Sequence, residues 1–99
     1  MLRSQREDFG PFFKQTRKGK GYSIKNLARE LMVDYSYLSK IENGHTLPSE
    51  EFIKKIAKLF GHDEEEIMLR AGKIPEDIIR ILRENPKEAI DFLRKKFRE

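Results

Sequence analysis

The sequence predicts an all-α protein in which five short helices form one domain and a C-terminal helical hairpin follows. Two observations predict this fold class. Apolar residues recur three and four positions apart in seven successive segments, and residue types that begin or end helices separate those segments. No segment alternates between apolar and polar residues as a half-buried strand does. The 99 residues suffice for one main core, so we expect a domain over residues 1–72 and an appendage over residues 73–99.

The first predicted helix covers residues 9–18. Phe9 and Phe13 recur there at helical spacing, and Asp8 can accept hydrogen bonds from the free amides of the first turn. Pro11 is tolerated near a helix start, where the amides have no intrahelical partner. A Gly-Lys-Gly segment then ends this helix.

Two short helices joined by a tight turn are predicted within residues 23–43. Ser23 and Asp34 are residue types that cap helix N-termini, and each precedes an apolar-periodic segment. This arrangement is typical of a helix-turn-helix, here at about residues 24–43, whose second helix fits a DNA major groove about 12 Å wide. The apolar residues expected to fix the angle between the two helices are Leu27, Ala28, Leu31, Val33, Leu38 and Ile41.

Four further helices are predicted in the second half of the chain. The first begins after Ser49 and has a continuous apolar face, and the second begins after Asp63 with three glutamates that complement the helix dipole. Pro75 and Pro86 each stand at a helix start, and Asn85 between them can cap the last helix. These two helices form the predicted hairpin.

The segment SIKNLARELMVDYSYLSKIENGHTLPSEEFIKKIAKLFG resembles the phage repressor and Cro-type (XRE) helix-turn-helix family. The resemblance covers roughly residues 9–71. It implies a five-helix, lambda-repressor-like DNA-binding domain that usually acts as a dimer on a short palindromic operator. The expected function is therefore sequence-specific transcriptional regulation, as a dimeric repressor, with no catalytic step.

Two residues depart from the family pattern. Many relatives have Gln at the start of the first motif helix and Gly in the turn, whereas this chain has Ile24 and Met32. The DNA contact that the Gln makes in relatives is therefore not carried over. Met32 predicts either a left-handed residue, strained by about 1 kcal/mol, or an altered turn.

Helical geometry predicts which side chains face the bases. With Leu38 and Ile41 pointing inward, the N-terminal half of the helix over residues 34–43 presents four side chains outward. Lysine can donate to guanine, serine can donate or accept, and tyrosine can contact a thymine methyl group. The predicted base contacts are Tyr35, Ser36, Ser39 and Lys40.

A second set of polar residues is expected to bind phosphates and so fix the position of the protein on DNA. These residues flank the recognition helix on both sides. They are Lys14, Ser23, Lys25, Tyr37, Asn43, His45 and Thr46. In relatives an Arg of the first helix pairs with the Glu that ends the recognition helix, so the resemblance implies a structural ion pair between Arg17 and Glu42.

Charge and composition agree with a nucleic-acid partner. Residues 1–47 contain nine Lys and Arg against five acids, whereas residues 48–99 contain twelve of each, so all of the net charge of +4 lies in the first half. No cysteine is present, His45 and His62 are isolated, and no glycine-rich phosphate loop follows a strand, so we expect neither an enzyme nor a metal or cofactor site. Because no apolar run approaches the ~18 residues that span a bilayer, a cytoplasmic protein without membrane contact is expected.

The hairpin over residues 73–99 has more apolar residues than two helices can bury alone. We expect it to pack on a second copy, because a dimer presents two recognition helices about 34 Å apart, one turn of DNA. An alternative is a protein-interaction module, such as an antitoxin or an anti-repressor, whose terminal helices bind a partner protein.

Overall fold

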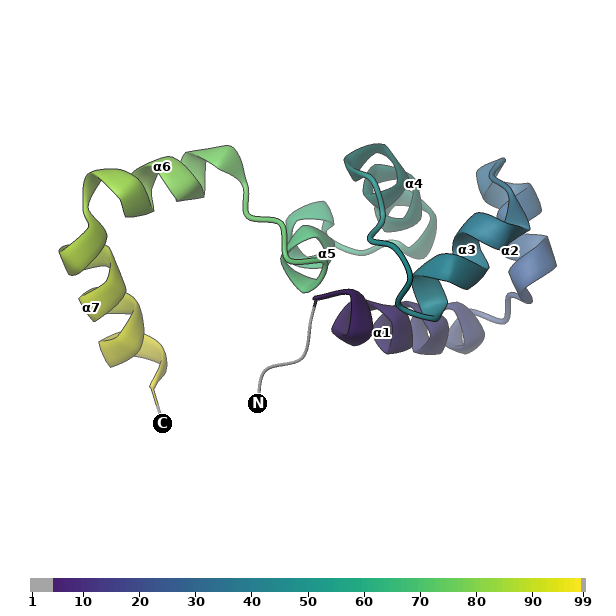
Figure 1. Ribbon diagram of the computed structural model, residues 1–99, viewed down its shortest axis with the longest axis horizontal. Coiled ribbons are helices and arrows are strands. Elements are labelled where there is room, and N and C mark those ends of the chain that lie inside the picture. Colours follow the sequence, from purple (N-terminus) through teal and green to yellow (C-terminus); the bar gives the residue numbers. More distant parts are fainter. Residues whose placement is uncertain (1–4, 99) are drawn as a thin grey trace.

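The computed structural model describes residues 5–98, and within them it contains seven α-helices and no strand, which confirms the predicted all-α class. α1–α5 gather into one cluster, and α6 and α7 extend from it as a hooked arm (Figure 1). The helices are α1 (Gln5–Gly19), α2 (Ile24–Leu31), α3 (Tyr35–Glu42), α4 (Glu50–Phe60), α5 (Glu64–Arg70), α6 (Glu76–Glu84) and α7 (Pro86–Phe97).

The buried core lies entirely within the five-helix cluster. α1 contributes aromatic rings, which stack on one another and meet Phe52 and Phe60 of α4 at ring-centroid distances of 5.8 and 6.4 Å. Such aromatic pairs add to the stabilisation that comes from area burial. The largest fully buried side chains are Phe9, Phe13, Leu27, Leu38, Ile41, Pro48, Ile53, Ile56 and Ile67.

The start of α1 differs from the prediction. The helix begins at Gln5 rather than at residue 9, so Asp8 lies inside the helix and not at its N-cap position. Pro11 is likewise inside the helix. A proline removes its own amide hydrogen bond, and this helix continues through that loss. The sequence pattern misplaces this start because proline is most frequent in the first turn of a helix, whereas Pro11 lies further along α1.

The two helices of the arm pack against each other, and neither contains a buried residue. The side-chain amide of Asn85 turns back and donates to the carbonyl oxygen of Ile81 at 3.2 Å. It therefore ends α6 and makes no cap hydrogen bond to α7, contrary to the expectation from the sequence. Most of the large apolar residues of the arm remain exposed in the single chain, and the others are half-buried.

Gly10 allows α1 to cross the end of α3 closely. A Cβ atom at this position would lie 2.5 Å from the carbonyl oxygen of Glu42 and 2.9 Å from that of Ile41. Both atoms belong to the backbone, which cannot move aside as a flexible side chain can. The absence of a side chain at Gly10 therefore sets the position of the last turn of α3 relative to α1.

Gly10→Ala is expected to destabilise the protein, although alanine favours helix by about 1 kcal/mol. The methyl group must push the two helices apart, and overpacking of this kind costs about 1–3 kcal/mol. Chemical denaturation measures the change. Gly19→Ala is the matched control, because a Cβ there meets nothing within 4 Å. Equal stability of both variants would contradict the close crossing.

Candidate nucleic-acid interface

The structure contains a helix-turn-helix formed by α2 and α3. Three residues join the helices, and the amide of Val33 donates to the carbonyl oxygen of Ala28 at 3.0 Å, which closes the turn. Met32 has φ 57° and ψ 45°, so it adopts the left-handed conformation that the sequence left as one of two alternatives. Its side chain is 87% exposed. The strain of a non-glycine residue here, about 1 kcal/mol, is therefore not offset by burial.

Arg17 and Glu42 form a buried ion pair between α1 and the last residue of α3. The Arg17 Nε donates to Glu42 Oε2 at 2.6 Å, and Nη2 donates to Oε1 at 3.1 Å. Nη1 donates to the carbonyl oxygen of Tyr22 at 2.7 Å. The two side chains are 6% and 4% exposed. This two-point geometry fixes the orientation of α3 as well as its distance from α1.

Arg17→Ala is expected to lower the free energy of unfolding by about 3–5 kcal/mol, because it leaves the Glu42 carboxylate buried without its partner. The double variant Arg17→Met with Glu42→Met should recover much of that loss, since it removes both charges. Urea denaturation measures the three proteins. A single variant as stable as the unchanged chain would show that the pair does not hold α3.

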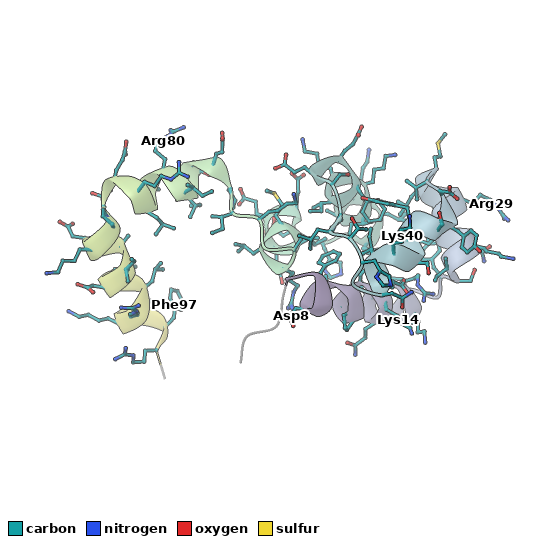
Figure 2. All side chains as sticks on the ribbon, in the orientation of Figure 1. Asp8, Lys14, Arg29, Lys40, Arg80 and Phe97 are labelled. Carbon is teal, nitrogen blue, oxygen red and sulfur yellow. The ribbon has the colours of Figure 1, made fainter. Side chains whose placement is uncertain are left out.

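The four predicted base-contacting residues lie on one outward face of α3. Tyr35 is 54% exposed, and Ser36 and Lys40 are also exposed. Ser39 is half-buried, and its hydroxyl oxygen accepts from Asn43 Nδ2 at 3.3 Å, which leaves the hydroxyl hydrogen available to a ligand. Figure 2 shows Lys40 on α3 within the five-helix cluster and Phe97 on the distant arm. α3 thus presents a polar, positively charged face.

The predicted phosphate contacts come from three places around α3. Lys14 of α1 and Lys25 of α2 are exposed, as are Asn43 and His45 after α3, whereas Thr46 is half-buried. Figure 2 shows Lys14 on the outer side of α1. These side chains supply donors and positive charge on α1, on α2 and after α3, as phosphate contacts require.

Two predicted phosphate contacts also have a role within the fold. The Ser23 hydroxyl oxygen accepts from the amide of Asn26 at 3.1 Å and so caps α2. The Tyr37 hydroxyl oxygen accepts from the amide of Ser49 at 3.1 Å, and its ring packs edge-on against Phe52 at 5.2 Å. In both residues the hydroxyl hydrogen can still be donated outward. A phosphate would therefore not have to displace either internal bond.

The sequence reasoning missed a link between α4 and the helix-turn-helix. Lys55 Nζ donates to the carbonyl oxygen of Leu31, the last residue of α2, at 3.3 Å. A lysine near a helix C-terminus satisfies a carbonyl without an intrahelical partner and complements the helix dipole. No local pattern marks Lys55, because the two residues are distant in sequence.

The described part of the chain offers few of the residues that a metal site or a membrane-spanning helix would need. Residues 5–98 contain no group of three His, Cys, Asp or Glu side chains that could hold a metal ion. Within the same residues, no helix combines the length and the apolar character needed to cross a bilayer. The polar face of α3 is therefore the strongest candidate for a binding site among the described residues.

The fold and the face of α3 define a helix-turn-helix protein. The profile of the helix-turn-helix family matches residues 13–67, more than half of the chain. The chain belongs to this family, and specifically to its phage repressor and Cro-type (XRE) branch, as its sequence resemblance implied.

Three curated relatives each match 49 residues of the chain. The HTH-type transcriptional regulator SlrR of Bacillus subtilis is 55% identical over 49 residues, which are 48% of this chain and 32% of SlrR. The regulators SinR of Bacillus subtilis and of Bacillus licheniformis are each 49% identical over 49 residues, 48% of this chain and 44% of SinR. The matched segment thus spans less than half the length of each relative.

Two solved structures of the clp gene regulator ClgR from C. glutamicum have a similar fold. One has a TM-score of 0.60 at 25% identity and covers 72% of this chain and 92% of its own. The other has a TM-score of 0.61 at 21% identity and covers 98% of both chains. The second likeness shows the fold alone, and it extends over the whole chain.

Proposed function

We propose that this protein is a sequence-specific DNA-binding transcriptional regulator that places α3 in the major groove. The observation that carries the proposal is the exposed polar face of α3, held by a buried ion pair at 2.6 Å. The basic excess of the first half of the chain supplies the attraction to phosphates. The relatives SlrR and SinR are transcriptional regulators by name.

The proposed activity is binding without catalysis, in the cytoplasm. Tyr35, Ser36, Ser39 and Lys40 read base edges, and the residues around α3 bind phosphates. Repression is the outcome we propose, because a protein that occupies an operator excludes other proteins from it. No cofactor is required for this binding.

Affinity for random duplex DNA is expected to fall steeply with salt, since each neutralised phosphate releases a counterion. With about six phosphate contacts, raising salt from 50 to 200 mM lowers affinity about a thousandfold. Fluorescence anisotropy with a labelled duplex measures this. Binding that is absent at low salt, or insensitive to salt, would reject DNA and favour a protein partner.

Two lysine variants distinguish base reading from phosphate binding. Lys40→Ala should lower affinity for the preferred sequence by about 1–3 kcal/mol and relax the preference at one base position. Lys25→Ala should weaken binding to all sequences alike and reduce the salt slope by about one per protomer. Competition with single-base operator variants measures both effects. Identical behaviour of the two variants would contradict the division of roles.

We further propose that the arm is a dimerisation element. α6 and α7 enclose an apolar groove of about 380 Å³, lined mainly by Ile78, Ile81, Leu82, Ala89, Phe92 and Leu93. Phe92 is 64% exposed and Phe97 is 72% exposed. The arm extends away from its own five-helix cluster (Figure 1). We therefore propose that the arm of a second copy of the chain covers the groove.

A dimer also matches the expected form of the DNA site. Two copies related by a twofold axis read a palindromic operator, with recognition helices about 34 Å apart. A protein partner that binds the arm, as for an antitoxin or an anti-repressor, remains the alternative. The same exposed apolar residues would serve it.

Ile81→Gln combined with Phe92→Gln is expected to give a monomer at micromolar concentration, because both substitutions place polar amides in the groove. Arg80→Gln combined with Lys87→Gln is the matched control; Arg80 lies on the opposite side of α6, beside Ile79 and Arg83. Analytical ultracentrifugation measures the oligomeric state. If the unchanged chain is itself monomeric, the arm serves a partner protein instead.

A further inference from the structure

Asp34 immediately precedes the recognition helix, α3, and its side chain makes no hydrogen bond with the described residues. It is the N-cap residue of α3, but its carboxylate accepts no cap hydrogen bond. It is exposed, and its side chain has no hydrogen bond or ion pair within residues 5–98. Three other caps of the chain are closed, at 3.1 Å in each case: Ser23 to Asn26, Ser49 to Phe52, and Asp63 to Glu65.

The charge of Asp34 is unusual for its surroundings. The acids between residues 9 and 49 are Glu30, Asp34 and Glu42. Glu42 is neutralised by Arg17, and Glu30 lines a shallow depression together with Lys55 and Lys58 of α4. Asp34 therefore brings an uncompensated negative charge to the end of α3 that enters the groove.

A carboxylate at a DNA-binding surface repels phosphates and loses its hydration when it enters the groove. It is compensated only where a base offers a donor and no adjacent acceptor. In the major groove guanine presents the acceptors O6 and N7, and thymine presents O4 and a methyl group. Adenine presents an amine beside the acceptor N7, whereas cytosine presents its N4 amine alone. A carboxylate therefore selects cytosine.

We propose that Asp34 is a specificity-determining residue that accepts a hydrogen bond from cytosine N4 at one position of each half-site. This inference rests on the proposed function, because it requires α3 to lie in the major groove. The carboxylate adds little to total affinity, since it is repelled by phosphates on every sequence. Its effect is on the difference between sites, which is what specificity measures.

Selection of bound duplexes from a random pool tests the proposal with the full chain and two neutral variants. The unchanged protein should enrich cytosine at one position per half-site, by about tenfold over the other bases. Asp34→Asn should move the preference to adenine, because a carboxamide pairs with adenine N6 and N7. Asp34→Ser should relax that position. Both variants should bind random duplex several-fold more tightly, because each removes the negative charge of Asp34, which repels the phosphates.

The control separates base reading from helix capping. Asp63→Asn makes the same chemical change at the N-cap of α5, where the carboxylate does accept an amide. It should leave base selection unchanged. Asp34→Asn should shift the unfolding midpoint only slightly, because no cap bond is lost and only the attraction of the charge to the helix dipole is removed.

Two results overturn the proposal, and they are distinguishable. If the unchanged protein enriches an operator and both Asp34 variants enrich the same bases at every position, Asp34 reads nothing and the proposed function stands. If the unchanged protein enriches no sequence and shows no salt-dependent binding, the proposed function fails and this inference fails with it.

Discussion

The geometry of the interface depends on the buried pair between Arg17 and Glu42. Burying two charges is expensive unless every donor finds an acceptor, and here the guanidinium divides its donors between the Glu42 carboxylate and the Tyr22 carbonyl oxygen. Such a pair adds little net stability, but it permits only one arrangement of the two helices. Gly10 acts in the same region, because its lack of a side chain lets the α3 carbonyls approach α1. Charge and close packing together fix the position of α3, the helix proposed to face DNA.

The five-helix cluster and the arm differ in how much of their apolar surface is exposed to water. The five-helix cluster buries its apolar residues and satisfies all buried side-chain polar atoms among the residues described. α6 and α7, of 9 and 12 residues, bury none of theirs. Isolated helices of this length are marginal in water, and most helical stability comes from packing of an apolar face. The arm therefore needs a further surface, whereas the cluster does not.

Local pattern was sufficient to predict the helices but not the contacts between them. The period of apolar residues located all seven helices, and five expected cap residues stand at N-cap positions: Ser23, Asp34, Ser49, Asp63 and Asn85. Asp34 occupies a cap position without making the bond, because a cap residue type predicts a boundary and not the direction of its carboxylate. The roles of Gly10 and Lys55 arise where distant segments meet, so no spacing in the sequence marks them. The Arg17–Glu42 pair was expected only through family resemblance, for the same reason.

The residues that build the motif and those proposed to face DNA belong to separate sets. Leu27, Leu38 and Ile41 are fully buried and set the angle between α2 and α3. Tyr35 and Lys40 are exposed on α3 and contribute nothing to that angle. A change in the exposed set is therefore expected to alter the base sequence recognised without altering the fold. A likeness of fold therefore predicts the arrangement of α2 and α3 but not the base sequence that the exposed side chains would read. The operator proposed for this protein has to be inferred from its own exposed side chains.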